Sequence, residues 1–502
     1  MPLPDRVLDA ATGPGDGADP RLRERALAVL TAPDLAHVVD LVAYADDDVI
    51  HVVNADGEVV FDRAAPYTRR SLTGRDPIAA QDPLAFSTLA DEPVAPTNEH
   101  NVYPLAAERL AGLFDHPAAP DLAVVHTAGH FWAERGGHLG EHGSLDVVQS
   151  RAPLVLSGAG VSHRGVLDRW ARTVDVGPTL AHALGVPARE DGTHHAEQTG
   201  RALADLVSPG AAYVVGLLWD GCNSSDLYAL AADGELPNVA RLLDGGCALR
   251  GGAIAEFPSV TLVNHTSAIT GTGPGRHGIL NNAYYDRRRG EQVVANESAT
   301  WHRASEWLEP AVETVFEVVA RAMPGTPTAC VNEPVDRGAS YSTFGLVRDH
   351  GHSDGAKSLT SSLPDPTADQ LATQEYVAAD SGYSWGSSVD ATGIAQVLGL
   401  WEDAATRPRL MWWNTTLTDS AHHAGGPHSA IARASMRDAD RRLGLFLDLL
   451  DDARLTDDTF ILLTSDHGSE AADPTCRGDW DEALRAAGIP FRDEAYGFIY
   501  LG

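Results

Sequence analysis

Short runs of apolar residues recur along the chain, and several end in polar residues that can take part in chemistry. Apolar runs of about four to eight residues bounded by turn signals are typical of buried strands. Three of them lead into Asp220, Asn414 and the pair Asp466-His467. Parallel strands present their carboxyl ends at one edge of a sheet, so these side chains are expected to meet. The predicted strands are residues 121–125, 152–157, 212–218, 409–413 and 459–463.

Helical periodicity alternates with these runs. Residues 236–243, 429–450 and 176–184 carry apolar side chains three and four positions apart, which is typical of amphipathic helices. Alternating strands and helices predict an α/β fold with a mostly parallel sheet covered by helices on both faces. The chain has 502 residues and 43% hydrophobic content, which is enough for one large core plus accessory segments.

Other parts of the chain have a different pattern. Residues 40–61 consist of short β-rich pieces broken by aspartates and by Asn54-Ala55-Asp56-Gly57, a hairpin turn signal. We expect residues 1–118 to form an accessory or cap lobe and residues 201–210 to form a linker. Residues 119–200 and 211–502 would then build the catalytic core, with a cap insertion at about 286–400, where Pro, Gly, Ser and Asp cluster.

The charge balance restricts the partners. The chain has 70 acidic and 37 basic residues, a formal net charge of −33. Such a field repels nucleic-acid backbones and anionic membranes, so neither a nucleic-acid polymer nor a membrane is expected as a partner. A small anionic substrate would need local positive charge at its site.

The sequence carries no sign of export. The four cysteines are scattered, without a Cys-x-x-Cys pair, which argues against structural thiolate zinc and favours a reducing compartment. Residues 1–20 lack a basic region followed by an apolar stretch, and no later run approaches the roughly 20 apolar residues of a membrane span. We therefore expect a cytoplasmic protein.

The first candidate for chemistry is Thr261. It follows a proline turn and precedes a segment with helical character, so it would lie at a helix N-terminus, where backbone N–H groups favour an anion. A threonine hydroxyl beside a metal ion could attack phosphorus. Taken singly, Thr261 and the strand-terminal Asp220 are more typical of ordinary structural roles.

Two later clusters contain residues that ligate metals. Asp419 and His423 are four residues apart and would share one face of a helical turn, although the adjacent His422 competes for the same role. Asp466 and His467 follow the apolar run 459–463 and could bind one ion in a strand-to-loop turn. Each cluster alone could be a solvated polar loop, but their joint occurrence at strand ends favours a metal site.

These motifs occur in the order and spacing of one enzyme family. They are Asp220-Gly221, Phe257-Pro258-Ser259-Val260-Thr261, Asn264-His265, His277-Gly278-Ile279, Asn282, Asp419-x-x-x-His423 and Asp466-His467-Gly468. The chain resembles the nucleotide pyrophosphatase/phosphodiesterase branch of the alkaline-phosphatase superfamily. The resemblance implies one metal bound by Asp220, Thr261, Asp466 and His467, and a second bound by Asp419, His423 and one further histidine. It also implies that Asn282 holds a phosphoryl oxygen.

The chain departs from this family in the position of the further histidine. In the family it lies well after the Asp-His-Gly motif, whereas here 34 residues follow Gly468 and none is a histidine. The stretch from Gly140 through His142 and on to Leu180 resembles the family's carboxyl-terminal segment instead. We therefore predict a circular permutation in which His142 completes the second site. His126, His130 and His138 are rival candidates.

The resemblance implies a two-metal phosphohydrolase that cleaves phosphodiester or pyrophosphate bonds of a small phosphorylated substrate through a phospho-threonine intermediate. Mixed imidazole and carboxylate ligands suit Zn²⁺ best, with Mn²⁺ or Fe as alternatives. Two other hypotheses stay open: hydrolysis of a carbon–phosphorus bond in a phosphonoacetate-type substrate, and a metal-stabilised binding protein without turnover. A phosphomutase is disfavoured because that branch typically uses a serine nucleophile.

Overall fold

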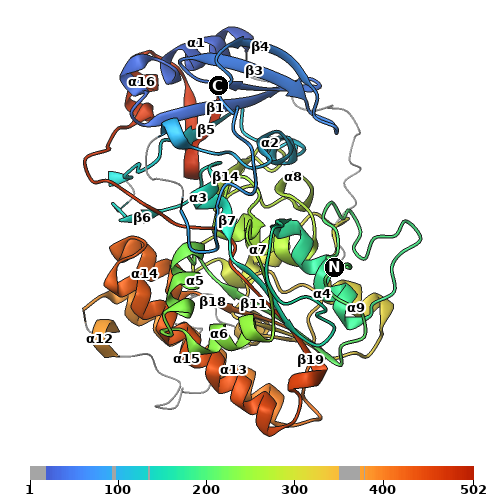
Figure 1. The fold of residues 1–502 in the computed structure, drawn as a ribbon. Helices are drawn as coiled ribbons and strands as arrows, with labels where there is room; N and C mark the ends of the chain where they lie inside the picture. Colours follow the sequence, from blue (N-terminus) through green and yellow to red (C-terminus); the bar gives the residue numbers. More distant parts are fainter. Residues whose placement is uncertain (1–18, 93–97, 134–135, 350–373, 378) are drawn as a thin grey trace.

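The computed structural model describes residues 19–92, 98–133, 136–349, 374–377 and 379–502, so part of the predicted cap lies outside the described residues. An eight-stranded sheet and a seven-stranded sheet organise this part of the chain. Figure 1 shows the smaller lobe, with its blue strands and α1 (Pro20–Leu30), above the helices that enclose the larger sheet. None of the described helices combines the length and apolar character needed to cross a bilayer.

The eight-stranded sheet confirms the predicted α/β architecture. Seven strands run in one direction, and only β8 runs against its neighbours β19 and β12. The order across the sheet is β17 (Tyr341–Ser342), β16 (Thr328–Val331), β18 (Leu410–Thr415), β11 (Tyr213–Trp219), β19 (Thr459–Thr464), β8 (Leu154–Gly158), β12 (Gly246–Leu249) and β9 (Gly165–Leu167).

Helices cover both faces of this sheet, as predicted. Side chains alternate along β11, so Val214 and Leu218 join one core cluster while Val215 and Leu217 join another. The first cluster includes α4 (Val176–Leu184), α7 (Thr261–Thr270) and α9 (Val315–Ala322). The second includes α5 (Ser224–Ala232), α6 (Pro237–Asp244), α13 (Ser381–Glu402) and α15 (Ala430–Asp452).

The seven-stranded sheet is antiparallel throughout. The predicted turn at Asn54 is confirmed, because the Asn54 side-chain oxygen accepts the N–H groups of Asp56 and Gly57. The sheet order is β21 (Phe491–Glu494), β22 (Phe498–Leu501), β5 (Leu122–His126), β1 (Val39–Asp46), β2 (Val49–Val53), β3 (Gly57–Asp62) and β4 (Arg69–Gly74).

Two of the five predicted strands differ from the expectation of a parallel sheet. The run 121–125 forms β5 in the antiparallel lobe, and the run 152–157 forms β8, which is antiparallel to its neighbours. A buried apolar run fits either direction, since direction depends on which strand lies alongside. β5 is fixed by its pairing with β1 and β22.

The remaining α-helices and short strands lie, in sequence, between strands of the two sheets. The helices are α2 (Ala106–Phe114), α3 (Val147–Ser150), α8 (Pro274–His277), α10 (Thr343–Asp349), α12 (Gln374–Val377), α14 (Leu417–Gly425) and α16 (Trp480–Ala486). The short strands are β6 (Gly140–Glu141), β7 (Arg151–Ala152), β10 (Ala171–Arg172), β13 (Ala253–Ile254), β14 (Ala283–Asp286), β15 (Glu291–Val294) and β20 (Glu470–Ala471).

The predicted linker, residues 201–210, packs against the main core. Leu203, Leu206 and Val207 are buried in the cluster that contains α4, and Gly210 donates its N–H to the carbonyl of Ala183. Residues 119–200 and 211–502 are therefore joined by a segment that is itself part of the packed structure.

The buried Asp40 makes the stability of the smaller lobe depend on pH. Burial raises the pKa of Asp40 to about 7, although its carboxylate accepts the Tyr103 hydroxyl at 2.6 Å. The folded state therefore keeps a proton that the unfolded chain loses, and stability falls as pH rises through about 7. We expect Asp40→Asn to be more stable than wild type at pH 8, by up to about 4 kcal/mol, and to lose this advantage toward pH 4.

Urea unfolding of both proteins at several pH values measures this difference. Asp46→Asn is the control, because Asp46 lies at the far end of the same strand with its side chain 52% exposed. A gap between Asp40→Asn and wild type that does not change with pH would contradict the prediction.

Candidate active site

Thr261 is the first residue of α7, as predicted for a helix N-terminus. Its side chain is buried but borders a narrow cleft that is also lined by Asp220, His265 and Asn414. The predicted phosphate-holding residue, Asn282, lies beside it, because the Asn282 side-chain oxygen accepts the N–H of Leu262 at 3.2 Å. Asn282 therefore contacts the first turn of the helix that Thr261 begins.

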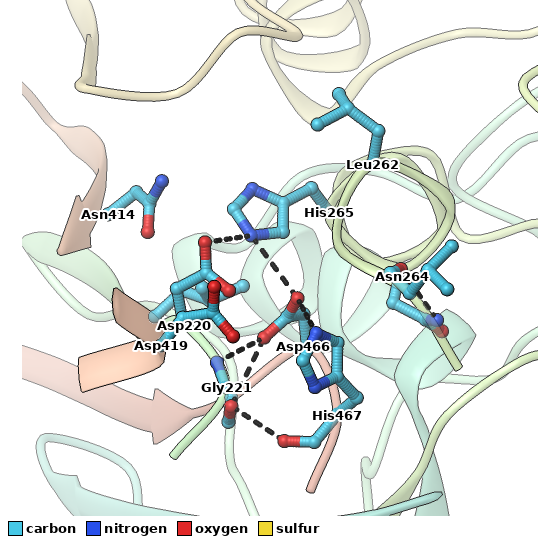
Figure 2. A network of polar contacts seen from close by, with 12 residues as sticks. Asp220, Gly221, Leu262, Asn264, His265, Asn414, Asp419, Asp466 and His467 are labelled. Atoms are coloured by element: carbon cyan, nitrogen blue, oxygen red, sulfur yellow. Dashed lines mark hydrogen bonds and ion pairs between the residues drawn. The ribbon is translucent and has the colours of Figure 1, made fainter. Parts of the chain in front are cut away.

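Three predicted ligands form the first metal-ligand group. Asp220 directly follows β11, and Asp466 and His467 follow β19, the parallel neighbour of β11. Ligand atoms of all three lie within 4.8 Å of one another. The backbone N–H of Gly221 donates to Asp466 Oδ1 at 2.9 Å and fixes that carboxylate (Figure 2). The order of strands in the sheet therefore brings together residues that are far apart in sequence.

The second group joins His142 to Asp419 and His423, with ligand atoms again within 4.8 Å. Asp419 and His423 lie one turn apart on α14, and the distance from His423 Nε2 to Asp419 Oδ2 is 3.4 Å. His142 follows β6 and places its Nε2 3.3 Å from that of His423. In Figure 2 the side chain of Asp419 lies beside that of Asp220, so the two groups are adjacent.

The structure distinguishes between the histidines that were candidates for the second metal site. His422 is buried and its Nδ1 contacts the carbonyl of Thr418 at 2.6 Å, so it belongs to neither group. Among the described residues, His126 and His130 also fall outside the metal-ligand groups. They contact Trp132 instead. His138 belongs to a third group together with Glu141 and His423.

Backbone carbonyls orient the three histidines of the two predicted sites. Nδ1 of His142, His423 and His467 lies 3.2, 2.7 and 2.8 Å from the carbonyl oxygens of Ser259, Gly140 and Gly468, respectively. A nitrogen facing a carbonyl oxygen must carry the proton, which leaves Nε2 as an acceptor. This second contact is typical of metal-binding histidines, because it fixes both the tautomer and the ring orientation.

As a result, acceptor atoms face one another. Nε2 of His142 faces Nε2 of His423 at 3.3 Å, and Nε2 of His467 faces Asp466 Oδ2 at 3.1 Å. Asp220 Oδ1, Asp466 Oδ2 and His467 Nε2 are buried without a hydrogen-bond partner. Opposed buried acceptors are costly unless a cation lies between them. The residues present therefore fit bound divalent ions.

The local electrostatics agree with this fit. Burial, followed by the nearby charges of Asp466 and Asp419, holds the pKa of Asp220 well above its usual range. Burial, followed by His467 and His423, holds the pKa of His142 well below its usual range. In the described part of the chain, no arginine forms an ion pair with the three aspartates. Divalent ions held by these residues would supply positive charge beside the three aspartates.

His265 and Glu333 are two buried residues of this region without a role predicted from the sequence. His265 lies one turn after Thr261 on α7, with Nε2 3.7 Å from Asp220 Oδ2 and 3.6 Å from Asp466 Oδ2 (Figure 2). Its Nδ1 contacts Glu333 Oε2 at 2.8 Å. Burial alone would lower the pKa of His265, but the negative charge and hydrogen bond of Glu333 outweigh burial and the pKa is raised. The four-residue spacing from Thr261 was a usable signal for His265.

Most of the residues of this site lie in a part of the chain that matches a known protein family. The sequence model described as type I phosphodiesterase / nucleotide pyrophosphatase matches residues 214–501, more than half of the chain. The chain belongs to this family. The match includes Thr261 and both motif pairs of the metal-ligand groups, whereas His142 lies outside it. The predicted nucleotide pyrophosphatase/phosphodiesterase branch is thereby confirmed.

Two curated relatives match parts of this phosphodiesterase-family chain. Alkaline phosphatase PafA of Elizabethkingia meningoseptica is 34% identical over 92 residues, which are 18% of this chain and 17% of the relative. An uncharacterized pyrophosphatase/phosphodiesterase of Schizosaccharomyces pombe is 25% identical over 268 residues, which are 51% of this chain and 44% of the relative. The chain thus spans less than half the length of either relative.

Solved structures that match include murine ectonucleotide pyrophosphatase/phosphodiesterase 5, an inactive form in complex with AMP, at 17% identity and a TM-score of 0.36. The match covers 56% of this chain and 64% of the murine chain. Phosphonoacetate hydrolase from Sinorhizobium meliloti, in complex with phosphonoformate, matches at 23% identity and a TM-score of 0.35, covering 55% of this chain and 59% of the hydrolase.

Proposed function

We propose that this chain hydrolyses phosphodiester or pyrophosphate bonds of small phosphorylated substrates, with Thr261 as the nucleophile and two divalent ions as cofactors. One observation carries the proposal. A threonine at a helix N-terminus lies beside two groups of acceptor atoms that face one another with no charge between them. Ordinary structural roles for these residues do not account for that arrangement.

Each ion has a defined set of candidate ligands. Asp220, Asp466 and His467, with the hydroxyl of Thr261, would hold one ion, and Asp419, His423 and His142 would hold the other. Nitrogen and carboxylate donors suit Zn²⁺ best, and Mn²⁺ or Fe fit the same donors. When bound, the ions would supply Lewis-acid stabilisation for charge that develops on the attacking and departing oxygens.

The protein groups would then act in two displacements. The Thr261 oxygen bonds to phosphorus while the bond from phosphorus to the leaving oxygen breaks, the hydroxyl proton passes to solvent, and a phospho-threonine forms. Water next attacks the same phosphorus, the bond to the Thr261 oxygen breaks, and a proton from that water restores the Thr261 hydroxyl. The backbone N–H of Thr261 and the side-chain NH₂ of Asn282, whose oxygen already accepts the N–H of Leu262, would hold the non-bridging oxygens through both steps.

A panel of three substrates tests this proposal. Metal-loaded protein should cleave bis-p-nitrophenyl phosphate faster than p-nitrophenyl phosphate, with little release of phosphate from phosphonoacetate. Preferred cleavage of phosphonoacetate would replace the proposal with carbon–phosphorus hydrolysis. Metal binding without turnover of any of the three would favour a binding protein.

The adjacent histidines of α14 provide a matched pair of variants. We expect His423→Ala to lose about one bound ion, because it removes a ligand nitrogen from the second group. His422→Ala should keep both ions, because His422 contacts only the carbonyl of Thr418 among the described hydrogen bonds. Metal content after gel filtration, measured by mass spectrometry, checks this prediction. Equal metal loss in both variants would contradict it.

We also propose that the chain is a circularly permuted member of its family. The family model begins at Val214, while the histidine that enters the second group lies earlier, at position 142. β22, which ends the matched range, pairs with β5 of the segment that contains His142. The family's carboxyl-terminal segment would therefore precede its beginning, joined by residues 201–210.

A further inference from the structure

A third metal-ligand group borders the second proposed site. His138, Glu141 and His423 bring ligand atoms within 4.8 Å of one another. His138 Nδ1 lies 3.5 Å from Glu141 Oε1, and the rings of His138 and His423 are 4.1 Å apart. Two imidazoles and a carboxylate are a donor set that divalent transition metals prefer. These three residues form what we call the outer group, and His142, Asp419 and His423 form the inner group.

The outer and inner groups share His423, so whether both can bind an ion at the same time depends on this residue. Nδ1 of His423 contacts the Gly140 carbonyl at 2.7 Å and carries the proton, so only Nε2 has a lone pair. One lone pair binds one ion at a time. An ion in the outer group therefore cannot coexist with an ion that uses His423 in the inner group, and the groups are alternative positions for the same ion.

The outer and inner groups differ in solvent exposure, which indicates the order in which an ion would occupy them. The side chain of His138 is 43% exposed, whereas that of His142 is 2% exposed. Glu141 is buried and directly precedes His142 in the chain. His138 is therefore the more accessible of the two histidines to an ion from solvent, whereas an ion can bind His142 only after it has left water. His423 contacts both histidine rings, at centroid distances of 4.1 and 5.1 Å.

We propose that His138 and Glu141 form an entry position for the second metal ion. The ion first binds His138, Glu141 and His423, and then exchanges His138 and Glu141 for His142 and Asp419 while His423 stays bound. Retaining one ligand avoids returning the ion to water between the two positions. This inference rests on the proposed function only in requiring the second ion, and it assigns His138 to loading rather than to resident binding.

The test measures uptake of Co²⁺ by metal-free protein in a stopped-flow spectrometer, using the visible absorption of the bound ion. For His138→Ala we expect uptake of the second ion to slow by at least roughly tenfold, the size of effect typical for loss of a group that supports a metal ligand. The final spectrum and the two bound ions should be the same as in wild type. Glu141→Gln should slow the same step.

The control is His163→Ala, because His163 is an exposed histidine on the loop between β8 and β9 and belongs to no metal-ligand group among the described residues. It should take up Co²⁺ like wild type. Unchanged uptake in His138→Ala would overturn the entry position. A final content of one ion in that variant would also overturn it, because His138 would then be a resident ligand. Wild type that binds fewer than two ions would instead refute the proposed function.

Discussion

Thr261→Ala is expected to abolish hydrolysis, with kcat reduced by about 10⁴- to 10⁶-fold, as when the nucleophile of a covalent mechanism is removed. Without the hydroxyl, no covalent bond to phosphorus can form at the N-terminus of α7. The other candidate ligands remain in place, so the variant should still bind both ions. Turnover of bis-p-nitrophenyl phosphate and metal content, measured on the same samples, check the prediction.

Two further substitutions separate chemistry from structure. Thr261→Ser keeps a hydroxyl at the same position and should retain measurable activity. Thr270→Ala removes a buried hydroxyl from the other end of α7, where it donates to the carbonyl of Thr266, and should leave kcat close to wild type. Activity in Thr261→Ala near that of wild type would show that another group attacks phosphorus.

The strands that carry the site could be predicted because they combine a strong pattern with a chemical ending. β11, β18 and β19 are apolar runs of the central sheet, and two of them lead into Asp220 and into Asp466-His467. Their parallel neighbourhood then follows from alternation with helices. Sequence alone cannot give the direction of an isolated strand. For this reason β5 and β8, expected in a parallel sheet, are antiparallel to their neighbours in the structure.

The details of the site depended on contacts that no local pattern encodes. The carbonyl of Gly140 orients His423, and Gly140 lies in a segment 283 residues away. The partner of His265 is Glu333, which follows the four-residue strand β16. A strand this short gives a weak periodic signal, so the sequence predicts no role for Glu333 although the residue is fully buried. Such contacts arise from tertiary packing and are visible only in the structure.

The net charge of −33 does not exclude a phosphorylated substrate, because the electrostatic field at the site depends mainly on the charges close to it. In the described part of the chain, most arginines that form ion pairs do so with exposed or half-buried carboxylates outside the site. The three aspartates of the site have only histidines as ion-pair partners there. If the proposed ions bind there, they would supply the local positive charge that a phosphorylated substrate requires.

His142→Ala should remove one bound ion and lower kcat/KM by at least roughly 100-fold, because it takes away both a ligand and charge stabilisation at the leaving oxygen. His142 is buried, its Nε2 faces His423, and it lies outside the range that the family model matches. Loss of one ion from this single change would mean that residues before position 214 complete the second site. That is the central requirement of a permuted chain.

His126→Ala is the matched control for His142→Ala, since His126 is a buried histidine of the same segment that belongs to no metal-ligand group in the described residues. It should cost stability but keep both ions. If His142→Ala instead retains two ions and full activity, then His138, the other histidine beside His423, becomes the resident ligand. The second site would still draw on residues 119–200, but both the assignment of His142 and the loading role of His138 would be wrong.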